Sequence, residues 1–128
     1  MEFKLQEKHK HPILSIAVDK VDSPVNAIID TGCYENYFFI GNNKPEDYGI
    51  FKLTGKLGVA HAAGGAEIPH QIVVHKITIA KWDFELEFGL CPGSFMGCSV
   101  ILGTRFLHDN KMVLSISGDH FSLNKITE

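Results

Sequence analysis

The sequence has 128 residues, which is enough for one domain with a hydrophobic core and too few for two. Its formal net charge is −3 and no basic run stands out, which argues against a nucleic-acid partner. The apolar runs are short, and residues 1–6 carry neither the apolar segment nor the cleavage site of a signal peptide, so we expect a cytoplasmic protein with no membrane partner.

The cysteines and histidines show no metal-binding or disulfide pattern. Three cysteines at 33, 91 and 98, without CxxC spacing, suit reduced thiols, and a bridge between Cys91 and Cys98 is the alternative. No HExxH or Cys/His zinc spacing occurs among the seven histidines. His70 and His75 lie on a predicted strand and point to opposite faces, and His9 and His11 lie near a terminus expected to fray. We therefore predict no metal and no cofactor.

The first predicted elements are strands joined by a tight turn. Residues 11–19 have the β-branched composition of a strand and end at the turn signal Asp22-Ser23-Pro24. Residues 25–30 return as a second strand, so the two form a hairpin whose second arm ends at Asp30. An aromatic-rich segment, residues 34–40, is predicted to be another short strand.

A second hairpin is predicted in the middle of the chain. Residues 56–79 are extended on both sides of Ala63-Gly64-Gly65-Ala66, where two adjacent glycines predict a tight tip. This tip is small and almost free of side chains, so it could lie over a bound molecule. Pro69 predicts an edge strand, because proline has no backbone N–H to donate. Before the hairpin, Pro45 followed by two acids predicts one helical turn.

The last third of the chain combines strands with one short helix. Residues 82–88 alternate strictly between apolar and acidic side chains, as in an antiparallel strand with one face on a core. An apolar run, residues 99–103, comes before Thr104, which is predicted to cap a helix reaching His108. Residues 112–123 read as a closing hairpin. These elements predict a single all-β domain, a small closed or strongly curled barrel with one short C-terminal helix.

An acid at the end of an apolar strand, in Ala27-Ile28-Ile29-Asp30-Thr31-Gly32-Cys33, is the candidate functional feature. Burying a carboxylate there is costly unless it is hydrogen-bonded or used in chemistry. Gly32 allows a sharp turn and the close approach of another chain or a ligand. Asp30 is thus either a catalytic acid or a structural acid that caps its own turn. Thr31 reads as a structural partner, since no nucleophile motif surrounds it.

Three features together resemble the retropepsin-like aspartic proteases, the family of retroviral proteases and their cellular and bacterial relatives. They are Ile28-Ile29-Asp30-Thr31-Gly32-Cys33, the glycine-rich hairpin about thirty residues later, and Val100-Ile101-Leu102-Gly103-Thr104-Arg105-Phe106-Leu107 ahead of the final hairpin. The resemblance extends from about His11 to Leu123. Cys33 replaces the alanine or serine usual in the family, and Ala63 replaces a larger aliphatic residue.

The resemblance implies roles for individual positions. Asp30 would be the catalytic acid, the Thr31 hydroxyl would tie two active-site loops together across a dimer, and Gly32 would allow their close approach. Leu102-Gly103 would pack beneath the catalytic loop. A flap tip that covers the substrate and donates backbone hydrogen bonds to it would consist of Ala62, Ala63, Gly64 and Gly65.

The implied function is that of a homodimeric aspartic endopeptidase. One Asp-Thr-Gly supplies half of a two-carboxylate site, so Asp30 of each subunit would meet at a two-fold axis. As is general for aspartic proteases, the two carboxylates would share a proton and activate a water against a peptide bond of an extended polypeptide. No metal or cofactor would take part. The alternative is a non-catalytic module that keeps the fold and only binds peptides or dimerises.

Overall fold

The computed structural model describes residues 2–4, 11–41, 44–48, 52–61, 65 and 67–126. Neither of the helices in these ranges is long and apolar enough to cross a bilayer. The elements, in chain order, are β1 (Glu2–Lys4), β2 (Ile13–Val18), β3 (Val25–Ile29), β4 (Tyr37–Phe39), the 3-10 helix η1 (Pro45–Tyr48), β5 (Lys52–His61), β6 (Glu67–Ile79), β7 (Trp82–Cys91), β8 (Val100–Leu102), α1 (Thr104–Asp109), β9 (Met112–Ser117) and β10 (His120–Lys125).

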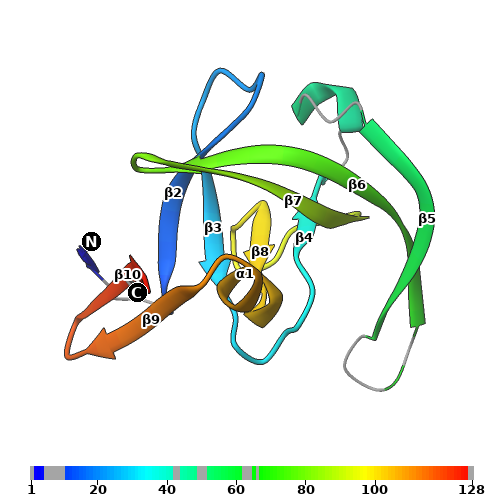
Figure 1. The fold of residues 1–128 in the computed structure, drawn as a ribbon. Coiled ribbons are helices and arrows are strands. Elements are labelled where there is room, and N and C mark those ends of the chain that lie inside the picture. The colour runs from blue at the N-terminus through cyan, green and yellow to red at the C-terminus, as the bar shows by residue number, and fades with distance from the viewer. Residues whose placement is uncertain are drawn as a thin grey trace.

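Six of the described strands close into a mixed β-barrel (Figure 1). Their order is β2-β3-β8-β4-β7-β6, and β6 returns to β2 through the antiparallel pairs Ala17 with Thr78 and Val18 with Ile77. The β3–β8 and β4–β7 pairs are parallel. Strand β5 pairs with β6 outside the ring. The predicted all-β barrel with one short helix is therefore confirmed.

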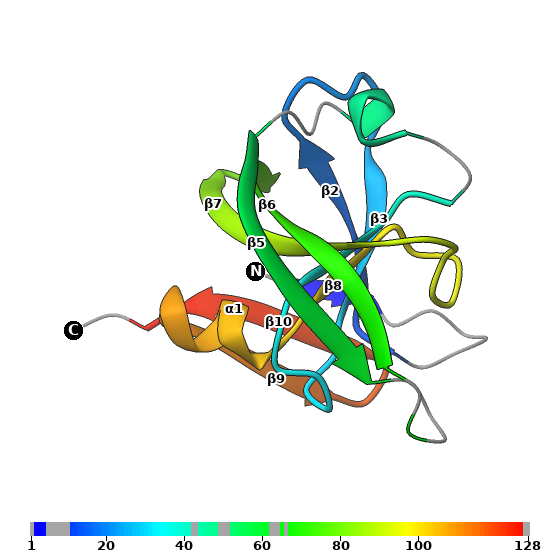
Figure 2. The ribbon, with the colours of Figure 1, turned by 90° about the vertical axis from the view of Figure 1, so that its right-hand side faces the viewer.

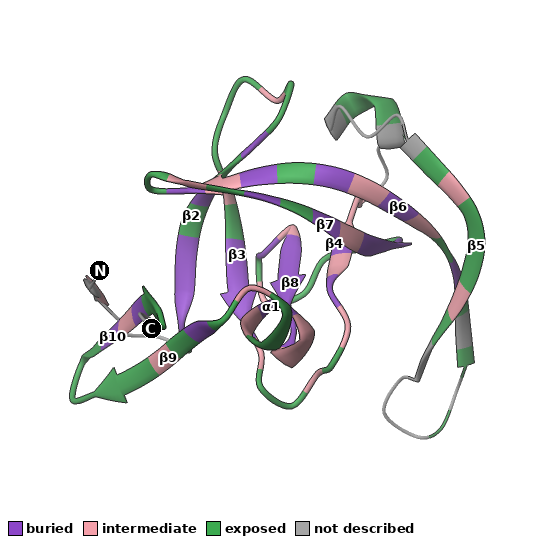
Figure 3. Ribbon diagram, viewed as in Figure 1, coloured by how far each residue is buried: buried purple, intermediate pink, exposed green. Residues whose placement is uncertain are grey.

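The core fills the inside of this barrel (Figure 3). On β7 the predicted alternation is confirmed, because Phe84, Leu86 and Phe88 are buried whereas Asp83 and Glu85 are exposed. Helix α1 adds the fully buried Phe106, whose ring meets that of Phe84 edge-on with centroids 5.0 Å apart. Aromatic packing therefore contributes to anchoring this short helix to the barrel.

A second sheet joins the two ends of the chain in the order β1-β10-β9 (Figure 2). The β9–β10 hairpin is the predicted closing hairpin. Strand β1 was not predicted, because three residues are too few to show a periodicity. It pairs with β10 through Phe3 and Phe121, whose rings stack with centroids 5.0 Å apart. His9 lies outside the described residues.

The prediction that Thr104 caps α1 is wrong. The capping position is occupied by Gly103, and no side chain caps the helix. The backbone N–H groups of Thr104 and Arg105 instead donate to the carbonyls of Cys33 at 2.8 Å and Tyr34 at 2.9 Å. These two amides need no capping side chain, since the loop after β3 supplies their acceptors.

The edge position predicted from Pro69 is wrong for the strand as a whole. Strand β6 has neighbours on both sides, β5 and β7. Its pairs with β7 begin only at Ile72, and Pro69 lies opposite Val59 of β5 alone. At Pro69 the sheet therefore has a single paired neighbour, which is where a strand tolerates proline. The helical turn predicted at Pro45 is confirmed as η1.

Candidate active site

The backbone of Asp30 continues the parallel pairing of β3 and β8. Its N–H donates to the Leu102 carbonyl at 3.0 Å, and its carbonyl accepts from the Cys33 N–H at 3.1 Å. The Oδ1 atom accepts from the Gly32 N–H at 2.9 Å. The side chain is half-buried. Asp30 thus caps its own turn, as the structural interpretation expected, and still presents a partly exposed carboxylate.

Thr31 and Gly32 lie at the surface next to Asp30. A Cβ atom at Gly32 would lie 3.3 Å from Asp30 Oδ1, so the absent side chain permits the tight N–H contact with the carboxylate. The exposure of these residues is compatible with the implied contact across a dimer. Their roles in such a contact stay predictions.

An apolar hollow of about 300 Å³ adjoins Asp30 and Thr31. Its walls include Ile29 of β3, Met96 of the loop before β8, and Leu114 and Ile116 of β9. Ile116 is 56% exposed. A carboxylate beside an exposed apolar surface suits either an apolar ligand or a second protein chain.

The loop after Asp30 is held from behind by a buried asparagine. Asn36 is 3% exposed, and its Oδ1 accepts from the Gly103 N–H at 3.1 Å while its Nδ2 donates to the Glu87 carbonyl at 3.3 Å. A Cβ at Gly103 would overlap the carbonyls of Tyr34 and Glu35. The Leu102-Gly103 segment therefore packs directly against this loop. Sequence reasoning missed Asn36, because an asparagine within an aromatic run carries no sign of its partners.

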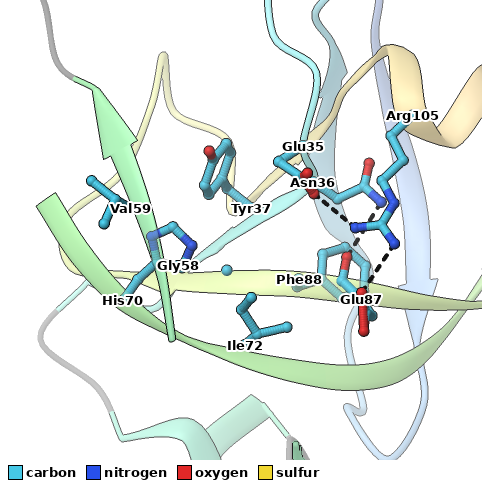
Figure 4. Close-up of a pocket in the computed structure, with 11 residues that line it drawn as sticks. Glu35, Asn36, Tyr37, Gly58, Val59, His70, Ile72, Glu87, Phe88 and Arg105 are labelled. Atoms are coloured by element: carbon cyan, nitrogen blue, oxygen red, sulfur yellow. Dashed lines mark hydrogen bonds and ion pairs between the residues drawn. The ribbon is translucent and has the colours of Figure 1, made fainter. Parts of the chain in front are cut away.

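Arg105 is the second side chain that holds the loop after Asp30, and it does so through ion pairs (Figure 4). Its Nη1 lies 2.8 Å from Glu35 Oε2, its Nη2 lies 3.0 Å from Glu87 Oε2, and its Nε lies 3.3 Å from Asp109 Oδ2. The hydrogen bond to Glu35 is the largest cause that raises the pKa of Arg105, and the bond to Glu87 adds to it. One guanidinium thus ties the loop to β7 and to α1.

The Cys33 thiol stays protonated at neutral pH. Burial raises its pKa, and the negative charge of Asp30 raises it further. Its Sγ donates to the Glu35 carbonyl at 3.3 Å. Cys33, Cys91 and Cys98 are all free thiols, so the alternative bridge between Cys91 and Cys98 is not formed. The raised pKa and the hydrogen bond to the loop favour a packing role for Cys33 over a nucleophilic one.

The arms of the predicted flap are β5 and β6. Figures 1 and 2 show the last residues of β5 and the first residues of β6 at the same end of the barrel as the loop after β3. Of the predicted tip, Ala62, Ala63 and Gly64 lie outside the described residues. Gly65 is exposed and has the positive φ, +86°, expected of a glycine turn.

Metal-ligating side chains do not cluster in the described ranges. No three of their His, Cys, Asp or Glu side chains come together as a metal site requires. The absence of a metal or cofactor from the reaction stays a prediction from the sequence.

No protein-family model matches the sequence, and no curated protein matches it either. Solved structures do match. A retropepsin-like aspartic protease from Rickettsia conorii has a TM-score of 0.67 at 18% identity, over 98% of this chain and 91% of that one. EIAV protease in complex with the inhibitor HBY-793 has a TM-score of 0.58 at 19% identity, over 81% and 91%.

The retroviral protease-like domain of Ddi1 from Leishmania major has a TM-score of 0.57 at 12% identity, over 91% and 90%. At these identities the likeness concerns the fold. The chain has the retropepsin-like fold that the sequence motifs predicted.

Proposed function

We propose that this chain, built on the retropepsin-like fold, is an aspartic endopeptidase whose catalytic acid is Asp30. The observation that carries the proposal is the place of Asp30 in that fold. It lies at the end of β3 with a half-buried carboxylate, within an Asp-Thr-Gly turn that is fixed by β8. A rigid backbone under a partly exposed carboxylate is the preorganised arrangement that acid–base catalysis needs.

The active enzyme in this proposal is a homodimer. Each chain carries one Asp30, and two carboxylates are needed to activate water on one side and polarise a peptide carbonyl on the other. The exposed Thr31 and Gly32, together with the exposed apolar Ile116 at the rim of the hollow, supply a surface on which a second copy could pack isologously.

The substrate in this proposal is an extended polypeptide. It would lie between the Asp30 loop and the β5–β6 hairpin, with Ala62, Ala63, Gly64 and Gly65 covering it. The ionised Asp30 would take a proton from the attacking water, and its protonated counterpart would return one to the leaving amide. A cytoplasmic location and the absence of nucleic-acid or membrane partners stay predictions from the sequence.

The test is the Asp30→Asn variant, which keeps the size and the hydrogen-bond acceptor but loses the charge and the basicity. Hydrolysis of an unfolded protein substrate, followed from acidic to neutral pH, should fall by at least about a thousandfold. Asp22→Asn is the matched control, because Asp22 is an exposed turn residue. Sedimentation on the same samples should show activity rising with the dimer fraction. Hydrolysis that survives Asp30→Asn would refute the assignment.

The alternative is a module that binds peptides or dimerises without catalysis. The hydrogen bond from the Gly32 N–H to Asp30 Oδ1 favours it to the extent that a purely structural aspartate makes the same contact. Peptide binding that is unchanged by Asp30→Asn, with no hydrolysis by the native chain, would select this alternative.

A further inference from the structure

A pocket of about 160 Å³ lies between the β5–β6 hairpin and the chain that follows Asp30 (Figure 4). Gly58 and His70 line it from the hairpin, and Glu35 and Tyr37 line it from the other side. One water takes up about 30 Å³ of liquid, so the pocket has room for a side chain of several heavy atoms. An extended ligand between the hairpin and the Asp30 loop would pass its mouth.

The floor of this pocket is a buried histidine without a partner. His70 is 9% exposed, and its Nδ1 has no hydrogen-bond partner. Buried polar side chains almost always have one, because an unpaired buried polar atom destabilises the folded protein. His75 on the same strand shows the ordinary arrangement, since it is 8% exposed and its Nε2 lies 2.9 Å from the Asp19 carbonyl.

Two strand glycines leave the imidazole its space. A Cβ at Gly89 of β7 would lie 2.6 Å from His70 Nε2, and a Cβ at Gly58 of β5 would also overlap that nitrogen. The ring of Tyr37 meets the imidazole edge-on with centroids 5.4 Å apart. Glycine weakens a strand unless something approaches its backbone closely. The two glycines and Tyr37 therefore hold the ring with Nε2 toward the pocket that both glycines line.

Of the two ring nitrogens of His70, Nε2 is the one that can donate a hydrogen bond to a ligand. A neutral imidazole carries one N–H, and a buried N–H without an acceptor is rarer than a buried acceptor without a donor. Nδ1 is sealed from solvent, whereas Nε2 lies against Gly58 and Gly89, which both line the pocket. The proton therefore belongs on Nε2, where a ligand can accept it.

The opposite side of the pocket offers acceptors. Glu35 and Glu87 each use Oε2 to bind Arg105, and Lys56 lies 3.6 Å from Glu87 Oε1. Among the described residues no partner is recorded for Glu35 Oε1. Two carboxylates repel an acidic ligand, and Arg105 already supplies the cation between them. A neutral group that accepts at one end and donates at the other fits this arrangement.

We propose that His70 is a specificity-determining residue, and that the pocket binds the carboxamide side chain of a glutamine or asparagine in the polypeptide ligand. The carboxamide oxygen accepts from His70 Nε2–H, and the NH₂ group donates to Glu35. That the carboxamide belongs to a polypeptide rests on the proposed function. The pairing of His70 with a carboxamide rests on the pocket alone.

The binding test uses the full chain with Asp30→Asn, which removes turnover and leaves the pocket intact. N-acetylglutamine methylamide is titrated against the matched glutamate and methionine compounds, with the imidazole nitrogen signals of His70 followed by NMR. We expect saturable binding of the glutamine probe near about 1 mM and binding of the other two at least about tenfold weaker. The shift should appear at His70 and not at His75.

Variants separate recognition from folding. His70→Phe should abolish the preference for glutamine over methionine, and His75→Gln, which changes an equally buried but partnered histidine, should preserve it. Glu35→Met tests the far side of the pocket without touching the buried ring, and should weaken the glutamine probe severalfold. Equal affinities for the glutamine and methionine probes, or a preference that persists in His70→Phe and Glu35→Met, would overturn the proposal.

A cleavage profile of the native chain on a peptide library gives a second readout. Glutamine or asparagine should be enriched at one fixed distance from the cut, and His70→Phe should lose this enrichment while preferences at other positions persist. An absence of all hydrolysis would count against the proposed function, and the titration would still decide the pocket. Hydrolysis without any carboxamide preference would overturn the role of His70 and leave the protease assignment standing.

Discussion

The Asp30 loop and the β5–β6 hairpin face each other and are held in opposite ways. Around the loop, backbone amides of Asp30, Thr104 and Arg105 all have carbonyl partners within 3.0 Å. In the hairpin, β6 is the only described strand that pairs with β5, and the Leu57 side chain of β5 is 78% exposed. His70 of this hairpin has an Nδ1 atom without a hydrogen-bond partner.

This difference suits the loop to positioning the Asp30 carboxylate and the hairpin to recognising a ligand. Hydrogen bonds with β8, α1 and Asn36 hold the loop in a fixed arrangement, which suits a carboxylate that must be placed accurately. The hairpin has a histidine with an unpaired nitrogen and lines a pocket, which suits a surface that binds a ligand. Substitutions in the loop should therefore cost stability, whereas equivalent changes in the hairpin should alter binding.

The largest difference is expected between two glycine-to-alanine variants. Gly103→Ala drives a methyl group into the carbonyls of Tyr34 and Glu35, which are backbone atoms, and should lower the free energy of unfolding by about 3 kcal/mol or more. Gly58→Ala meets only a side chain, the His70 imidazole, which can yield by turning out of the space between the two glycines, and should cost about 1–2 kcal/mol. Urea unfolding measures both. Equal losses would break the contrast between loop and hairpin.

A smaller loss of folding stability is expected when the buried Asn36 side chain is removed. Asn36→Ala leaves the Gly103 N–H and the Glu87 carbonyl without their partner and should cost about 2–3 kcal/mol in thermal or urea unfolding. Asn110→Ala is the control, since Asn110 Nδ2 donates one hydrogen bond, to the Phe106 carbonyl at 2.9 Å. Its loss should be about 1 kcal/mol. If Asn36→Ala lowered the free energy of unfolding no more than the control, the loop would not depend on the hydrogen bonds of Asn36.

The smallest effect concerns the thiol of Cys33, which lies close to Asp30, the proposed catalytic acid. Burial and the charge of Asp30 raise the pKa of Cys33, so alkylation, which needs the thiolate, should reach half its maximal rate at a higher pH than for an exposed cysteine. Asp30→Asn removes one of these causes, lowers the pKa and should speed alkylation a few-fold at mildly alkaline pH. Mass spectrometry of the labelled peptide gives the rate. Cys98, whose pKa burial alone raises, is the internal control.

Local patterns in the sequence were sufficient for most of the barrel. The β2–β3 hairpin, the alternation on β7 and the closing β9–β10 hairpin each follow from residues adjacent along the chain, because strand period and turn chemistry are local properties. The same holds for Asp30, whose place at the end of an apolar strand can be read from seven consecutive residues.

Long-range contacts were decided only in three dimensions. Asn36 reaches Gly103 across 67 positions and Arg105 reaches Glu35 across 70, and neither pairing leaves a periodic trace in the sequence. Gly103 replaced Thr104 as the capping residue because a distant loop supplied the acceptors. The place of Asp30 was thus set by its own neighbours. The contacts of Asn36 and Arg105 that hold the loop after Asp30, and the surroundings of His70 Nε2, depend on strands that meet only when the barrel closes.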